Sequence, residues 1–163
     1  MDNFVSRRKS DHTGRRVSDH EVPSWIDPDE SDYFITVCCK QRGTNQLCLL
    51  GTGTALLNSA RFYLARGKWL PFVFLLMPDH LHMIVAFGFQ HRMEAVVEAW
   101  KRHAATKHKI VWQRGFFDHR LRSGESVEAK GAYIRQNPVR AGLVQEADDW
   151  LFFFEARHDS RGK

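Results

Sequence analysis

One segment near the middle of the chain most constrains the fold, because it reads as two strands joined by a short turn. Trp69–Met77 is an almost unbroken apolar run, and His80–Phe87 follows it after a two-residue Pro-Asp turn. Aromatic and β-branched residues between turn residues are typical of strands. Tyr33–Cys39 and Phe116–Leu121 have the same character, so we expect four strands in all.

Three stretches with apolar residues at helical spacing lie between and after these strands. The first can be capped by Thr54 and ends at Gly67, the second is Met93–Lys107, and the third is Ser126–Asn137 with its serine as the cap. The order β-α-β-β-α-β-α predicts an α+β fold with a ferredoxin-like (RRM-like) antiparallel sheet and helices packed on one face. Such a sheet leaves its other face free for a ligand or a nucleic acid.

The 163 residues carry a formal charge of +5 and suit one domain. Residues 1–31 are polar and basic, and we expect them to form an arm ahead of a folded domain at 32–163. The arm either binds nucleic acid or is an ordinary terminus. Its candidate phosphate-binding residues are Arg7, Arg8, Lys9, Arg15 and Arg16.

Three cysteines, two of them adjacent, do not suit a disulfide framework. The N-terminal residues contain no apolar signal-peptide core, and Trp69–Met77 is too short to span a bilayer. We therefore expect a cytoplasmic protein with no membrane contact.

Two histidines give the sharpest local pattern. His80 and His82 are two residues apart in a predicted strand, so both rings point to one face while Leu81 and Met83 point to the other. Two imidazoles on one face can ligate a divalent metal. The pattern is short, and a pair of hydrogen-bonded surface histidines explains it equally well.

Tyr133 and Asn137 form a second candidate pair, because residues four apart share a helix face. Tyr133 could be a nucleophile and Asn137 a neutral oxygen ligand. The alternative is a core-facing tyrosine and an asparagine that ends the helix before Pro138. Tyr33 lies in a predicted buried strand and Tyr63 on an apolar helix stripe, so Tyr133 is the better nucleophile of the three tyrosines.

A basic tract with interleaved aromatic residues runs over residues 101–122, from the second predicted helix to the end of the fourth predicted strand. Cations neutralise phosphates and aromatic rings stack on unpaired bases, although a solvated helix face beside core aromatics would look similar. The aromatic residues are Trp112, Phe116 and Phe117. The candidate phosphate contacts are Lys101, Arg102, Lys107, Arg114, Arg120 and Arg122.

Three segments in this order, MPDHLHMIV, VWQRGFFDHRLR and YIRQNPVRAGLV, resemble the REP-associated tyrosine transposases. These are HUH single-strand transposases with one catalytic tyrosine. The resemblance implies an HUH transposase-like catalytic domain with a C-terminal extension over 32–163. It also implies that Tyr133 is the nucleophile and that His80, His82 and Asn137 hold Mg²⁺ or Mn²⁺.

The resemblance implies a single-stranded DNA endonuclease and strand transferase that acts at hairpins through a 5′-phosphotyrosine intermediate, and hence a role in DNA transposition or recombination. The expected partner is single-stranded hairpin DNA rather than a small molecule, and the protein is a monomer or a homodimer. Two alternatives stay open. One is a non-catalytic module that binds single-stranded DNA or RNA, and the other is a metal-dependent nuclease that uses activated water.

Overall fold

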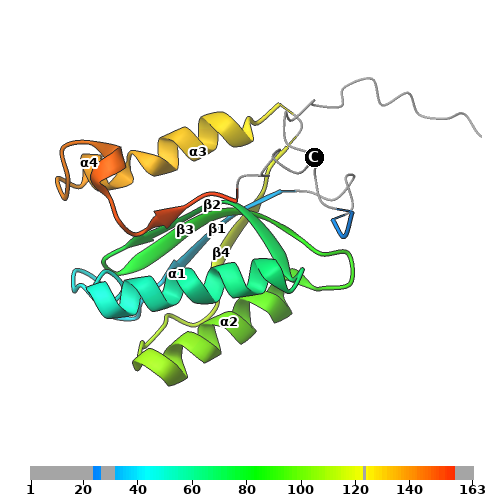
Figure 1. Cartoon of the computed structure of the whole chain (residues 1–163), viewed down its shortest axis with the longest axis horizontal. Coiled ribbons are helices and arrows are strands. Elements are labelled where there is room, and N and C mark those ends of the chain that lie inside the picture. The colour runs from blue at the N-terminus through cyan, green and yellow to red at the C-terminus, as the bar shows by residue number, and fades with distance from the viewer. Residues whose placement is uncertain (1–23, 27–31, 123, 157–163) are drawn as a thin grey trace, which may run out of the picture.

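The computed structural model describes residues 24–26, 32–122 and 124–156, which form an antiparallel sheet with helices on both faces (Figure 1). The strands lie in the order β4-β1-β3-β2-β5. They are β1 (Tyr33–Cys38), β2 (Trp69–Met77), β3 (His80–Phe87), β4 (Phe117–Arg120) and β5 (Phe153–Phe154). The helices are α1 (Leu50–Ala65), α2 (Met93–His108), α3 (Val127–Arg135) and the short α4 (Asn137–Arg140), followed by a 3₁₀ turn at Ala147–Asp149.

The predicted fold class is confirmed. The strands β4-β1-β3-β2, with α1 and α2 as the two crossovers, have the ferredoxin-like arrangement. One detail differs, because α1 and α2 cover one face of the sheet while α3 lies across the other (Figure 1). The order of elements along the chain did not reveal this, since α3 follows the last strand of the ferredoxin-like core.

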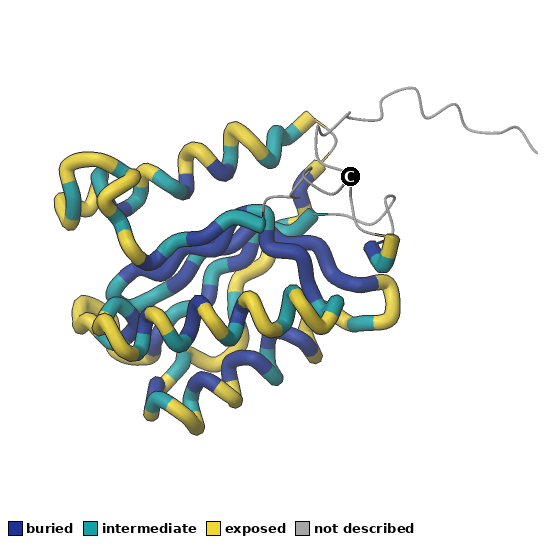
Figure 2. The backbone as a smooth tube through the Cα atoms, viewed as in Figure 1, coloured by how far each residue is buried: buried dark blue, intermediate teal, exposed yellow. Residues whose placement is uncertain are grey.

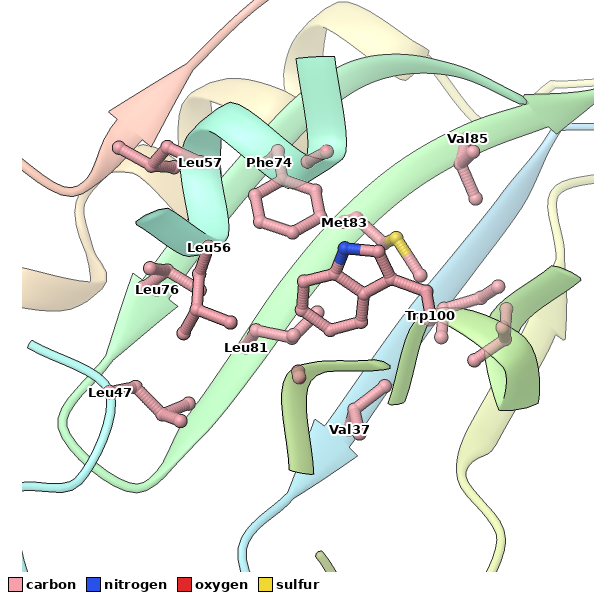
Figure 3. Close-up of a cluster of buried hydrophobic side chains, with 14 of the residues drawn as sticks. Val37, Leu47, Leu56, Leu57, Phe74, Leu76, Leu81, Met83, Val85 and Trp100 are labelled. Atoms are coloured by element: carbon pink, nitrogen blue, oxygen red, sulfur yellow. The ribbon is translucent and has the colours of Figure 1, made fainter. Parts of the chain in front are cut away.

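The main core lies between the sheet and the pair α1 and α2 (Figure 3). Leu81, Met83 and Val85 of β3 point into it and meet Leu56 of α1 and Trp100 of α2. Figure 2 shows the central strands buried between helices whose outer surfaces are exposed. Burying large apolar side chains stabilises a fold by about 1.5–3 kcal/mol each, so this face holds most of the stability.

A smaller apolar cluster lies on the opposite face, beneath α3. Ile134 of α3 packs there with Leu75 of β2 and Ile84 of β3. A Cβ added at Gly131 would lie 3.0 Å from Val73, so the helix approaches β2 closely at that position. This contact helps to hold α3 over the face of β3 that carries His80, His82 and Ile84.

Most of the predicted boundaries agree with the structure, and the exceptions have local causes. The first helix begins at Leu50 rather than Thr54, and no side chain caps its first turn. Ser126 caps α3 as predicted, since its Oγ accepts a hydrogen bond from the backbone N–H of Ala129 at 3.1 Å. The helix ends at Arg135, two residues before the predicted end at Asn137.

The chain after α4 returns to the sheet as β5, which pairs with β2. The indole Nε1 of Trp150 donates to the backbone oxygen of Leu76 at 2.8 Å, and Arg135 forms ion pairs with Asp148 and Glu155. These contacts bind the end of α3 to the tail that follows it.

The division into an arm and a domain stays a prediction. Of residues 1–31 the structure describes Ser24, Trp25 and Ile26, and Ile26 is only 4% exposed and packs with Leu70 and Ala86. The predicted phosphate contacts Arg7, Arg8, Lys9, Arg15 and Arg16 lie outside the described residues. Among the helices that are described, none has the length and apolar character that a membrane span requires.

Candidate functional site

The two histidines lie on the face of β3 opposite the main core. Their ring centroids are 4.7 Å apart, and the ring planes are nearly perpendicular at 80°. This close approach of the two rings confirms the prediction that both lie on one face of the strand. Thr36, which is paired with His82 in the sheet, bonds to the His82 ring on that same face. The strand period of two therefore separates two imidazoles from the apolar residues between and after them.

The ring of His82 is held by two neighbours from β1. Its Nδ1 is 2.9 Å from the hydroxyl of Thr36, and its plane stacks on Phe34 with centroids 5.6 Å apart. Burial lowers the pKa of His82 to about 4, with smaller contributions from His80, Arg42 and Arg140. The imidazole is therefore neutral near pH 7, and when Nδ1–H donates to Thr36 the lone pair on Nε2 is free for a metal.

His80 is oriented by the carboxylate that precedes it. Its Nδ1 is 2.7 Å from Oδ1 of Asp79, whose other oxygen accepts from the backbone N–H of Gly43 at 2.6 Å and lies 3.3 Å from Nε of Arg42. Burial alone would raise the pKa of Asp79, but hydrogen bonds from His80 and Gly43 and the charge of Arg42 outweigh it and lower that pKa. A carboxylate that holds one ring nitrogen directs the other toward a metal.

Neither Asp79 nor Thr36 was identified from the sequence as part of the site. Asp79 stands next to His80, but its role depends on a loop that supplies Arg42 and Gly43 from another part of the chain. Thr36 is 46 residues away from the ring it holds, and only the register of β1 against β3 brings the two together.

Tyr133 lies on the surface, with 64% of the residue exposed, so the core-facing alternative is wrong. Asn137 begins the short helix α4 after a break at Gln136. Arg140 connects the two, because its Nη2 donates to the backbone oxygen of Tyr133 at 2.8 Å and to the side-chain Oδ1 of Asn137. Its guanidinium carbon lies 3.9 Å from the centroid of the Tyr133 ring.

Three contacts show that the tyrosine helix lies over the histidine face of the sheet. Lys130, one turn before Tyr133, places its Nζ 5.1 Å from the ring centroid of Phe34, and that ring stacks on His82. Ile134 packs in the same cluster as Ile84, the residue two positions after His82. Arg140 is close enough to contribute to the lowered pKa of His82. Both halves of the predicted site therefore lie on one side of the sheet.

Comparison with known proteins agrees with this geometry. The chain is 27% identical over 138 residues to the REP-associated tyrosine transposase of Escherichia coli (strain K12), with 80% of this chain and 79% of that protein covered. A putative REP-associated tyrosine transposase of Haemophilus influenzae is 23% identical over 141 residues, with 74% and 77% covered. The chain is therefore similar to REP-associated tyrosine transposases over most of its length. No family model matches the chain.

The fold is that of a solved REP-associated tyrosine transposase bound to a REP hairpin. The TM-score is 0.64, with 23% sequence identity over 82% of this chain and 81% of that one. These similarities to REP-associated tyrosine transposases confirm the resemblance found in the sequence.

The resemblance to these transposases implies a divalent metal, and in this chain the two histidines are the candidate ligands for Mg²⁺ or Mn²⁺. Among the described residues there is no group of three or more His, Cys, Asp or Glu that could hold a metal, so the histidine pair needs further oxygen ligands. The amide oxygen of Asn137, which follows α3 on the same side of the sheet, could supply one such ligand. Two neutral imidazoles and a neutral oxygen leave positions for water and phosphate oxygens, which these ions accept readily.

The residues of the predicted basic tract lie in different environments. Lys101 is only 4% exposed, and its Nζ donates to Glu98 and to the backbone oxygens of Gln113 and Gly115. Lys101 was therefore wrongly predicted as a DNA contact, because its ammonium is used inside the fold. The exposed members of the tract are Arg102, Lys107, Arg114, Arg120 and Arg122.

These cations do not all belong to the histidine face. Arg102 and Lys107 are on α2, which covers the opposite side of the sheet. Of the three aromatic residues, Trp112 and Phe116 pack against the main core. Phe117 is 59% exposed, and it pairs with Thr36, so it lies on the histidine face beside the site.

Proposed function

We propose that this chain is a metal-dependent single-stranded DNA endonuclease and strand transferase that acts at hairpin sequences through a 5′-phosphotyrosine intermediate. The observation that carries the proposal is the position of the Tyr133 helix over the sheet face that presents His80 and His82. A family relative whose solved structure is bound to a REP hairpin supports the choice of DNA as the partner. The proposed activity serves DNA transposition or recombination.

The protein's own groups prepare the site before any DNA arrives. Thr36 and Asp79 fix the two imidazole rings so that each directs Nε2 outward, and burial keeps His82 neutral. His80, His82 and Asn137 would hold the divalent cation. A cation held by these residues would polarise the scissile phosphate and stabilise the charge that develops on it.

Tyr133 supplies the nucleophile. Its Oη forms a bond to phosphorus and the bond from phosphorus to the 3′ oxygen breaks, so the phenol loses a proton and the departing 3′ oxygen gains one. The product is a 5′-phosphotyrosine and a free 3′-OH. A different 3′-OH can then attack the phosphotyrosine and rejoin the strands, because the energy of the phosphodiester is kept in the covalent link.

The open part of the histidine face offers a path for the unpaired strand. Phe117 is exposed there, Phe34 lies between it and His82, and Lys130 adds a positive charge above the ring of Phe34. Exposed rings stack on unpaired bases whatever their identity, and nearby cations neutralise phosphates. We therefore propose that the unpaired bases beside the scissile phosphate stack on the ring of Phe117.

The test uses labelled hairpin-bearing single-stranded DNA with Mn²⁺ and separates products on a denaturing gel. Wild type should form an SDS-stable adduct, and Tyr133→Phe should bind the DNA without forming one. Tyr63→Phe is the matched control, since that ring packs against Trp69 on the opposite face, and it should form the adduct. His80→Ala or EDTA should block cleavage more than binding.

The outcomes separate the proposal from its two rivals. An adduct from Tyr133→Phe would overturn the assignment of the nucleophile. Cleavage by wild type without any adduct would identify a nuclease that uses activated water. Binding without cleavage, over a panel of hairpins and with either metal, would identify a binding module.

A further inference from the structure

Arg140 occupies the oxygen through which Asn137 would bind a metal. Its Nη2 donates to Oδ1 of Asn137 and to the backbone oxygen of Tyr133, and its guanidinium lies against the Tyr133 ring. One cation of the protein therefore contacts the proposed nucleophile and the proposed third ligand at once. The function proposed above assigns no role to this residue.

Arg140 also opposes a metal at this site by its charge. A guanidinium that donates to the amide oxygen of Asn137 would repel a divalent cation brought to the same oxygen. Arg140 therefore opposes metal binding both by occupying Asn137 and by its positive charge.

Resting on the proposed function, we propose that Arg140 is a gate on the metal site that the DNA opens. In the DNA-free protein Arg140 holds Asn137 and Tyr133 together and keeps the cation weakly bound. The scissile phosphate offers a guanidinium two oxygens that share one negative charge, and these bind it better than one neutral amide oxygen does. When Arg140 turns to the phosphate, Oδ1 of Asn137 is released to the cation, so metal and DNA strengthen one another's binding.

A purely structural role for Arg140 is the rival explanation. Arginine near a helix C-terminus often donates to the last carbonyl groups, and the bond to the Tyr133 oxygen is of that kind. That role predicts a loss of stability when Arg140 is removed and no change in metal affinity. The contacts with the Asn137 amide and the phenol ring predict an effect on the metal itself.

The first experiment measures Mn²⁺ binding to the DNA-free full chain by the electron paramagnetic resonance signal of free Mn²⁺. Arg140→Met keeps the length of the side chain and removes the charge, and it should bind Mn²⁺ about tenfold more tightly than wild type. Arg135→Met is the matched control, because Arg135 ends the same helix but pairs with Asp148 and Glu155. It should lower thermal stability and leave Mn²⁺ affinity unchanged.

A second pair of measurements places the effect at this site and tests its link to DNA. The gain from Arg140→Met should disappear when His80→Ala is added, because the cation then loses a ligand. In a Tyr133→Phe background, which cannot cleave, hairpin DNA should tighten Mn²⁺ binding. Adding Arg140→Met should remove most of that DNA-induced gain.

The results distinguish failure of the gate from failure of the proposed function. If wild type forms the phosphotyrosine adduct but Arg140→Met binds Mn²⁺ no more tightly than wild type, the gate is wrong and the function stands. If Arg140→Met shows the gain but wild type forms no adduct on any hairpin, the function is wrong and the gate describes a metal site of another use. Equal gains from Arg140→Met and Arg135→Met would mean that removing either positive charge strengthens Mn²⁺ binding, and the gate would be wrong.

Discussion

The buried ring of His82 should make the stability of this protein depend on pH below neutrality. In the unfolded chain a histidine takes up its proton near pH 6.5, whereas in the folded protein the pKa of His82 is about 4. Between these values the unfolded state binds more protons, so the folded state loses stability as pH falls through this window. The loss is complete below about pH 4 and absent well above pH 6.5.

The size of the effect follows from the two pKa values. Lowering the pH from 7 to 5 should reduce the free energy of unfolding by about 2 kcal/mol through His82 alone, by the linkage relation between proton uptake and unfolding. His82→Gln removes the titrating group and can keep a hydrogen bond to Thr36. The variant should therefore lose about 2 kcal/mol less than wild type over the same change of pH.

Urea unfolding followed by tryptophan fluorescence, at pH 7 and pH 5, measures this difference directly. EDTA must be present, because a metal held by the neutral imidazoles would add its own dependence on pH. Groups such as the ion pair of His119 and Glu125 occur in both proteins, so their contribution cancels in the difference. Equal losses for wild type and His82→Gln would refute the reasoning.

Three further predictions concern packing and DNA. Lys101→Met should lower the free energy of unfolding by about 2–3 kcal/mol, because the backbone oxygens of Gln113 and Gly115 lose the ammonium that bonds to them, and hairpin affinity per folded molecule should not change. A specific loss of hairpin affinity would restore Lys101 to the DNA-binding set. Gly53→Ala should destabilise by about 1–3 kcal/mol, since the added Cβ would lie 2.4 Å from ring carbons of Phe152; an unchanged urea midpoint would show that the ring moves freely. Phe117→Ala should weaken binding of unpaired DNA about tenfold or more while Phe117→Trp retains it, as measured by fluorescence anisotropy; equal affinities would place the strand elsewhere.

The parts of the fold that could be predicted are those that depend on local pattern. Tyr33–Cys38, Trp69–Met77 and His80–Phe87 were all predicted as strands, because β-branched and aromatic runs bounded by turns have few other solutions. The start of α1 could not be predicted, because its first turn at Leu50 has no capping side chain to mark it. The face on which α3 packs depends on the fit of Gly131 against β2, and such a fit is invisible in one sequence.

The same division applies to the site. The period of two along a strand was enough to place His80 and His82 together, whereas their supports come from partners that only the sheet register and a distant loop provide. The sequence did indicate a buried position for Lys101, because it is four residues after Val97 and three before Ala104 and so shares a helix face with both. The positive charge of Lys101 suggested a DNA contact, whereas its position on the helix places it inside the fold.

Leu81, Met83 and Val85 of β3 point into the main core and the two imidazoles point to the opposite face, so the main core and the histidine pair use separate side chains. Mutations that erase both rings would leave the layer formed by Leu81, Met83 and Val85 untouched. A descendant of this protein could therefore lose the proposed cleavage and joining of DNA and still persist as a folded protein, available for another role.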